Sequence, residues 1–196
     1  MIFKCTRALD FACRLGVIHR DLKPANILRA GGGGSDVKIS DFGAALTTSS
    51  DQTAVAGIGS PAFMSPQQVK DHPLNHQTDI FSLGVVMYLL LTGQRPFQGS
   101  NNISIVYQIA NVDPPPPSAM RNGIPDVVDR IVGRALKKSL EERYASWDEF
   151  SFDLAEAFRN EHLAERREQI ADSEKFNTLR GLSFFRDFSD VQLWEV

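Results

Sequence analysis

The sequence predicts a mainly α-helical fold with one small β-hairpin. The strongest observation is the stretch Ile80–Leu91, which is apolar nearly all round and is therefore typical of a helix buried inside a domain. Two short apolar runs, Ile27-Leu28 and Val37–Ser40, flank a glycine-rich turn and predict the hairpin. At 196 residues, the chain is long enough for one domain of about 100–200 residues.

The composition is typical of a soluble globular protein and excludes several classes. Hydrophobic residues make up 42% of the chain and charged residues 23%. The formal net charge of −3 argues against a general nucleic-acid binder, which is normally basic. The apolar run at 80–91 is shorter than the roughly 20 residues that a membrane span needs. We therefore expect no nucleic-acid partner and no insertion into a membrane.

The cysteines and histidines predict neither a disulfide framework nor a metal site. Cys5 and Cys13 are the only cysteines, and their spacing suits neither a metal knuckle nor a set of bridges. We expect reduced thiols in a reducing compartment and, because no secretory signal is visible, a cytoplasmic location. His72 and His76 are four residues apart, but Pro73 between them argues against a helical zinc pair.

The chain begins with a helical pattern, since Ile2, Leu9, Cys13 and Val17 recur on one face of residues 1–17. We expect this helix to bury that face and to lead into the next motif.

A catalytic-loop pattern follows this helix. His19-Arg20-Asp21-Leu22-Lys23-Pro24-Ala25-Asn26 reads H-R-D-L-x-x-x-N. Transfer of a phosphoryl group from ATP requires a carboxylate beside the attacking hydroxyl and a nearby metal ligand that neutralises phosphate charge. Asp21 and Asn26 are of these types, and the short loop between them lets both side chains face one small volume. Asp41-Phe42-Gly43 follows the predicted strand Val37–Ser40, and the two linked motifs are far more specific than either alone.

Together these motifs resemble the protein kinase family, and its serine/threonine branch in particular. The resemblance implies transfer of the γ-phosphate of ATP to serine and threonine hydroxyls of protein substrates, with ATP and Mg²⁺ as cofactors. Asp21 would then orient the hydroxyl and accept its proton, while Asn26 and Asp41 would hold magnesium. Lys23 marks the serine/threonine branch and would contact the transferred phosphate. Leu28 would lie under the adenine ring; an ordinary core leucine is the other interpretation.

The resemblance continues through residues 44–59, a polar segment that corresponds to a kinase activation loop. Its hydroxyl groups are candidate phosphorylation sites, and a phosphate there would pair with Arg20. A solvated, unmodified loop is the alternative. Ser60 stands where the family usually has threonine, and its hydroxyl would bridge Asp21 and Lys23. The phosphorylation candidates are Thr47, Thr48, Ser49, Ser50, Thr53 and Ser60.

The end of this segment departs from the family pattern at one position. The usual ending is A-P-E, whereas this chain has Ser65-Pro66-Gln67. The family's glutamate makes a buried ion pair with a late arginine, to which Arg143 corresponds. Gln67 accepts a hydrogen bond but carries no charge, and a buried guanidinium without a charged partner is costly. Two outcomes stay open. Either the substrate-docking region is held less rigidly than in the family, or the Arg143 side chain lies in water.

Three further residues are expected to shape the loop. Asp79 begins the predicted buried helix, where its charge suits the positive helix end. In kinases this residue also holds the backbone at the positions of His19 and Arg20. Phe42 is expected to pack inward, and Gly43 to give the backbone its freedom.

The later part of the chain predicts three more helices and one stiff connector. A short helix is expected at Asn102–Ala110, and helices at Pro125–Lys138 and Ser146–Phe158. Pro114–Pro117 favours a polyproline II connector; a ligand for an SH3 or WW domain is the alternative. The string Gly31–Ser35 is interpreted as a natural turn, with an engineered linker as the alternative.

The motifs that are present cover only part of a kinase. The glycine-rich G-x-G-x-x-G loop and the V-A-I-K lysine are not found, so we expect a large C-terminal lobe without its N-terminal lobe. A small lobe or regulatory domain would come from sequence elsewhere. The expected division is residues 1–158 for this lobe, 159–178 for a charged helical linker, and 179–196 for a truncated start that resembles a cyclic-nucleotide-binding domain.

Two functions remain open at this point. One is a protein serine/threonine kinase that acts on protein substrates, with negligible turnover expected from these 196 residues without the small lobe. The other is a catalytically inactive kinase lobe that binds protein partners, because an uncovered docking face would be apolar.

Overall fold

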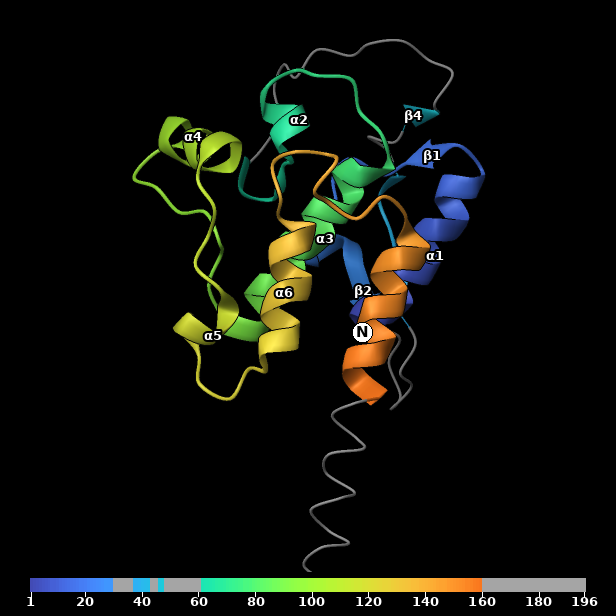
Figure 1. Cartoon of the computed structure of the whole chain (residues 1–196). Helices are drawn as coiled ribbons and strands as arrows, with labels where there is room; N and C mark the ends of the chain where they lie inside the picture. Colours follow the sequence, from blue (N-terminus) through green and yellow to red (C-terminus); the bar gives the residue numbers. More distant parts are fainter. Residues whose placement is uncertain (30–36, 43–45, 48–60, 160–196) are drawn as a thin grey trace, which may run out of the picture. The chain divides into compact units, whose positions relative to one another are not determined.

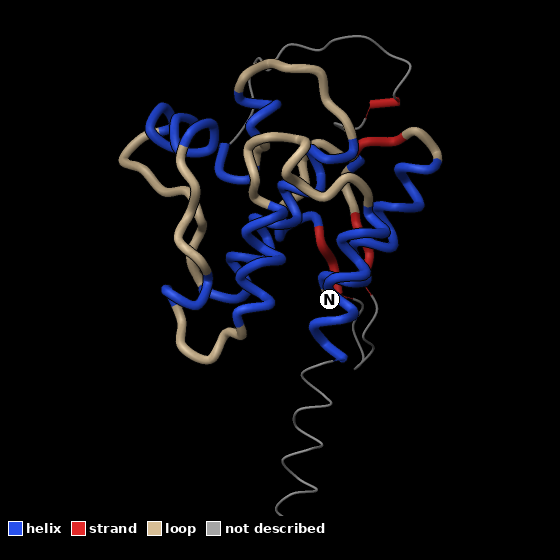
Figure 2. Tube along the Cα trace, viewed as in Figure 1, coloured by secondary structure: helices blue, strands red, loops and turns tan. Residues whose placement is uncertain are grey.

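A largely buried helix, α3 (His76–Thr92), lies at the centre of the described structure (Figure 1). The computed structural model describes residues 1–29, 37–42, 46–47 and 61–159. Figure 2 shows that helices predominate and that the strands are short. The other elements are α1 (Ile2–Arg14), β1 (Val17–Ile18), a 3₁₀ turn η1 (Pro24–Asn26), β2 (Ile27–Arg29), β3 (Val37–Ile39), β4 (Leu46–Thr47), a second 3₁₀ turn η3 (Pro61–Phe63), α2 (Pro66–Val69), α4 (Asn102–Asn111), α5 (Pro117–Met120), α6 (Asp126–Ala135) and a helix at 147–159.

The ends of α3 are set by local chemistry. The Asn75 side chain caps the first turn by accepting a hydrogen bond from the Gln77 backbone N–H at 2.9 Å. At the other end Gly93 adopts φ 74°, a left-handed conformation that costs glycine little. Between these caps, residues 77–88 are all buried, which confirms the predicted buried helix.

A glycine allows α3 and α6 to approach each other closely. A Cβ placed on Gly84 would lie 2.9 Å from the Ala135 Cβ and 3.2 Å from Leu136 Cδ2. The missing side chain therefore lets the α6 backbone pack against the middle of α3. Figure 1 shows α6 lying along α3, with α5 next to both.

Two antiparallel strand pairs flank the helices. β2 and β3 form the predicted hairpin, in which Ile27 pairs with Ile39 and Leu28 with Lys38. β1 pairs with β4, so that Val17 lies opposite Thr47. This second pair was not predicted from the sequence, because a strand of two residues is too short to show any periodicity. The turn predicted at Gly31–Ser35 lies outside the described residues.

The predicted helices are confirmed, with small differences at their ends. The helix expected at Pro125–Lys138 is α6, which is shorter at both ends, and Pro125 is its N-cap residue. The expectation that Pro117 is non-helical was wrong, because it is the first residue of the short helix α5. A proline is tolerated at that position because its missing N–H has no partner within the helix.

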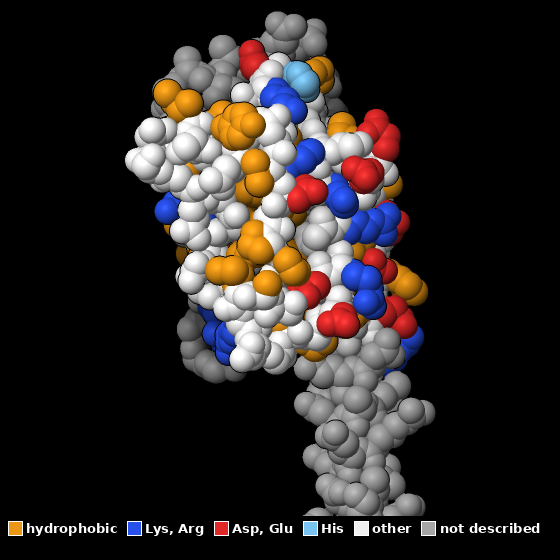
Figure 3. Space-filling view, turned by 60° about the vertical axis from the view of Figure 1, so that its left-hand side comes forward, with side chains coloured by type: hydrophobic (Ala, Val, Ile, Leu, Met, Phe, Trp, Pro, Cys, Tyr) orange, Lys and Arg blue, Asp and Glu red, His pale blue; other side chains and the backbone are white. Residues whose placement is uncertain are grey.

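The chain divides into two compact units, Met1–Ala155 and Glu156–Val196, and only four residues of the second are described. On the first unit, large apolar side chains are exposed on α4, just after it and in α5: Ile103, Tyr107, Val112 and Met120. Figure 3, which brings this side forward, shows hydrophobic side chains over the face. Within the described ranges, no helix is both long and apolar enough to cross a bilayer.

Candidate functional site

The backbone of the catalytic-loop motif is held by one buried carboxylate. Asp79, in the first turn of α3, accepts hydrogen bonds from the His19 N–H at 2.7 Å and the Arg20 N–H at 2.8 Å. Burial raises the pKa of Asp79, and these two backbone hydrogen bonds oppose that rise. Arg20 adopts φ 71°, which is uncommon for a residue other than glycine. The carboxylate thus stabilises a sharp local turn that aims the next residue, Asp21, away from the core.

The imidazole of His19 connects the loop to the segment that carries Asp41. Its Nε2 lies 3.0 Å from the Ser40 carbonyl oxygen, and its Nδ1 lies 3.3 Å from the Asp21 backbone nitrogen. A carbonyl can only accept and an N–H can only donate, so these contacts select the neutral tautomer with its proton on Nε2. His19 is fully buried, so its role here is structural.

The expected inward packing of Phe42 was wrong. Its ring centroid lies 4.6 Å from that of His19, yet the residue is 41% exposed. Contact with one imidazole covers only one side of a phenyl ring. Gly43, whose freedom was also predicted, lies outside the described residues.

Three polar side chains meet just after this turn. The Lys23 ammonium lies 2.6 Å from Asp21 Oδ2. The Asn26 amide nitrogen donates to the Asp21 carbonyl oxygen at 2.8 Å and reaches Oδ2 of the same residue at 3.4 Å. Hydrogen bonding to Asp21 raises the pKa of Lys23, so the lysine side chain stays protonated and positively charged. The arrangement places an accepting carboxylate, a cation and an amide in one small volume.

Asn26 and Asp41 fit the oxygen-ligand chemistry of magnesium. Both hydrogen bonds of the Asn26 side chain use its nitrogen, so no described residue occupies its oxygen. The Ser40 N–H donates to the Asn26 carbonyl at 2.9 Å, which fixes the adjoining Asp41 near Asn26. Asp41 adopts φ 66° and is exposed. Magnesium is commonly held by one or two such oxygens together with phosphates and water. Elsewhere in the described part of the chain, no group of three or more His, Cys, Asp or Glu residues is placed to hold a metal.

Helix α2 is hydrogen-bonded to the catalytic-loop motif through a residue that the sequence analysis did not single out. The Gln68 amide nitrogen donates to the Arg20 carbonyl oxygen at 2.7 Å. Its amide oxygen accepts the Ser65 N–H, while the Ser65 hydroxyl accepts the Gln68 N–H. This is a capping box, and the spacing Ser-x-x-Gln before α2 was the available sequence signal.

Arg143 does not lie in water, so that outcome is excluded. The residue is 1% exposed, and its guanidinium donates to the Gln67 Oε1 at 3.1 Å, to the Gln77 carbonyl at 2.8 Å and to the carbonyls of Lys137 and Lys138. No carboxylate among the described residues pairs with it. Burial lowers the pKa of Arg143 to about 10. Its hydrogen bonds are satisfied, but its charge is not neutralised.

Leu28 is 49% exposed in β2, so the interpretation as an ordinary core leucine was wrong. It lies opposite Lys38 in the hairpin that follows η1. Of the phosphorylation candidates, Thr47 belongs to β4, and the others lie outside the described residues.

Comparison with known proteins identifies what this arrangement resembles. A family model described as "Protein kinase domain" matches residues 1–151. Serine/threonine-protein kinase PknB of Mycobacterium tuberculosis is 36% identical over 183 residues, and its counterpart in Mycobacterium leprae is 41% identical over 152 residues. Serine/threonine-protein kinase PknL of Mycobacterium tuberculosis is 39% identical over 148 residues. These matches cover 91%, 76% and 74% of this chain, but only 29%, 24% and 37% of the respective relatives.

Proposed function

Because the chain belongs to the protein kinase family, we propose that it carries the catalytic loop of an ATP-dependent protein serine/threonine kinase. The observation that carries this proposal is the cluster of Asp21, Lys23 and Asn26 on a backbone held by Asp79. The names of the relatives support the serine/threonine assignment. The reaction is transfer of the γ-phosphate of ATP to serine or threonine hydroxyls of protein substrates.

Each side chain has a task in this reaction. Asp21 orients the substrate hydroxyl and accepts its proton, since its partly exposed carboxylate is the charged acceptor of the cluster. Lys23 places positive charge beside the transferred phosphoryl group. Asn26 and Asp41 would hold magnesium, which supplies neutralisation of the phosphate charge. Leu28 would support the adenine ring, and its exposure leaves it available for that contact.

The lobe and domain assignments are part of the same proposal. The compact unit Met1–Ala155 and the family match over 1–151 support a kinase large lobe at residues 1–158. A glycine-rich loop and a strand lysine would be supplied by sequence outside these 196 residues. Apart from Arg159, the last residue of the helix at 147–159, the linker at 159–178 and the start of a cyclic-nucleotide-binding domain at 179–196 lie outside the described residues. A cytoplasmic location is proposed from the free thiols of Cys5 and Cys13.

Magnesium-dependent ATP binding tests the proposal. We expect the chain to bind ATP more tightly with magnesium than without it, and Asp41→Asn to remove the difference. Asp148→Asn is the matched control, because this exposed aspartate makes only a surface ion pair with Arg14. Titration calorimetry measures both. An Asp41→Asn variant that retains the full magnesium effect would overturn the assigned ligand.

A non-catalytic interaction module is the second candidate. The exposure of Leu28 and Phe42 beside the catalytic loop favours it, since exposed apolar side chains attract partners. The absence of ATP binding by the chain, with or without magnesium, would favour this function over the first.

A further inference from the structure

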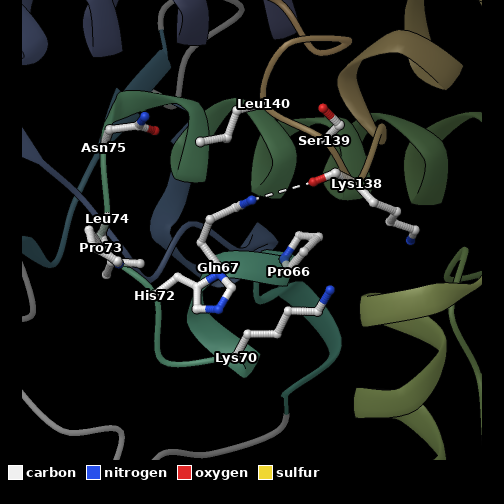
Figure 4. Close-up of a pocket in the computed structure, with 10 residues that line it drawn as sticks. All are labelled: Pro66, Gln67, Lys70, His72, Pro73, Leu74, Asn75, Lys138, Ser139 and Leu140. Carbon is white, nitrogen blue, oxygen red and sulfur yellow. Dashed lines mark hydrogen bonds between the residues drawn. The ribbon is translucent and has the colours of Figure 1, made fainter.

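A pocket of about 590 Å³ lies beside the Gln67–Arg143 contact. It is bounded by α2, the turn that follows it, and the segment after α6 (Figure 4). Its volume is in the range of sites that take ligands or peptide side chains. The residues that line it are Pro66, Gln67, Lys70, His72, Pro73, Leu74, Asn75, Lys138, Ser139 and Leu140.

The charged lining residues are all basic. Lys70 and His72 are exposed, and their side chains form no hydrogen bond or ion pair with any described residue; only their backbone N–H groups donate, to Pro66 and Gln67. Both come from the end of α2 and the turn after it, and Figure 4 shows their side chains on the same side of the pocket as Gln67. Lys138 contributes a second ammonium group from the opposite segment. No carboxylate lines the pocket; the exposed Glu141 accepts a hydrogen bond from Ser139 at its border.

Lys138 is partly buried and poorly neutralised. Its ammonium lies 4.0 Å from the centre of the Phe97 ring and only 3.4 Å from its one hydrogen-bond acceptor, the Gln108 carbonyl. The pKa of Lys138 is lowered to about 8, mainly by burial; the exposed Asp113 opposes this shift, and the charges of Arg143 and Lys70 add to it. The positive charges of Arg143 and Lys70 therefore disfavour the protonated form of Lys138.

Arg143 adds a buried charge behind the pocket. Its five N–H groups are occupied by Gln67 and by backbone carbonyls, so it cannot bind a ligand directly. The positive charge of Arg143 still acts on the pocket, because the Gln67 oxygen that accepts its hydrogen bond carries no negative charge. The lining residue Gln67 also donates to the Lys138 carbonyl at 3.4 Å, the contact drawn in Figure 4. The replacement of a carboxylate by an amide thus leaves this pocket more positive.

We propose that this pocket binds an acidic segment of a protein partner, with carboxylate side chains at Lys70 and His72 and apolar side chains against the leucine and proline walls. Lysine and histidine are compact donors that suit single carboxylates, whereas no free arginine fork is present among the lining residues to favour a phosphate. The Gln68–Arg20 hydrogen bond connects α2, which lines the pocket, to the loop that carries Asp21. This inference goes beyond the proposed function and does not require phosphoryl transfer.

Fluorescence anisotropy without ATP tests the site. The probe is a fluorescein-labelled peptide that alternates glutamate with leucine and glycine, and its comparison peptide has glutamine for every glutamate. We expect the acidic peptide alone to bind, and salt to weaken it. Lys70→Glu should weaken binding by about fivefold or more. Arg130→Glu is the matched control, because this exposed residue of α6 undergoes the same charge reversal outside the pocket.

The Gln67→Glu variant distinguishes a loss of peptide binding from a loss of the folded state. A new carboxylate beside Arg143 should weaken the acidic peptide while the protein stays folded, as judged by its urea midpoint. Equal binding of the glutamine peptide, or equal losses in Lys70→Glu and Arg130→Glu, would overturn the proposal. Because the assay contains no ATP, these results do not depend on whether the chain is an active kinase.

Discussion

At the scale of single residues, the surroundings of Arg143 differ most from the family pattern. A guanidinium that is 1% exposed is compensated here only by neutral acceptors. A buried charge costs more when its partner is neutral than when it is a carboxylate. The residue nevertheless stays buried, because its hydrogen bonds connect Gln67, the start of α3 and the turn after α6.

Gln67→Glu should therefore raise the free energy of unfolding by about 1–2 kcal/mol. The gain is smaller than the ~3–5 kcal/mol lost when a buried pair is broken, because hydrogen bonds already compensate part of the cost and because the variant loses the long 3.4 Å donation from Gln67 to the Lys138 carbonyl. Gln77→Glu is the control with the same chemical change. Its amide nitrogen donates to the carbonyls of Leu140 and Tyr144, which a carboxylate cannot do, so that variant should be less stable. Urea unfolding measures both; equal shifts would contradict the account.

The depressed pKa of Lys138 predicts a pH dependence of stability. The unfolded chain keeps the lysine proton up to about pH 10.5, whereas the folded chain releases it near pH 8. The unfolded state thus binds more protons in this window, and this contribution to stability rises with pH. Lys138→Met keeps the packing on Phe97 but removes the titration, so the variant should lack the rise.

Urea unfolding at about pH 7.5 and about pH 10 measures the difference between the two proteins. Burial raises the pKa of Cys5, Tyr88 and Tyr144, and these groups oppose the rise equally in both proteins. A stability that falls with pH relative to Lys138→Met would show that the lysine is not buried as described.

The residues of the site differed in how well the sequence predicted them. Asp21 and Asn26 were predicted because their chemistry imposes a fixed spacing within one loop. Asp79 was assigned by resemblance alone, since its contacts with His19 and Arg20 join segments about sixty residues apart. The exposure of Phe42 depends on what covers its ring, which no local pattern specifies.

At the scale of elements, the contact between α3 and α6 depends on Gly84. Gly84→Ala places a methyl group 2.9 Å from the Ala135 Cβ, so the helices must separate, at a cost of about 1–3 kcal/mol. Gly133→Ala is the matched control, because a Cβ there meets nothing within 4 Å. That variant should be stabilised by about 0.5–1 kcal/mol through helix propensity. Thermal unfolding tests the pair, and a tolerated Gly84→Ala would contradict the described packing.

Helices were predicted better than strands because their signals are longer. α3 and α6 extend over several turns and show either continuous or periodic apolarity. The pair of β1 and β4 has two residues in each strand, and its pairing joins positions about thirty residues apart. Only tertiary contacts select such strands, so the sequence alone could not reveal them.

At the scale of the whole molecule, the residues proposed for catalysis all lie in the unit Met1–Ala155. Its catalytic loop, its two strand pairs and its buried α3 form one connected support for Asp21. The family match over residues 1–151 covers the same part of the chain.

Phosphate transfer from γ-labelled ATP to a generic protein substrate tests the central claim most directly. Wild type and Asp21→Asn, each prepared together with the sequence that supplies the glycine-rich loop and strand lysine, are compared with magnesium present, and the labelled product is hydrolysed to identify the modified amino acid. We predict phosphoserine or phosphothreonine in the wild-type reaction and a rate lower by about 10²-fold or more in Asp21→Asn, at an unchanged unfolding midpoint. Transfer that is equally fast in Asp21→Asn would contradict the assignment of Asp21 as the group that accepts the proton.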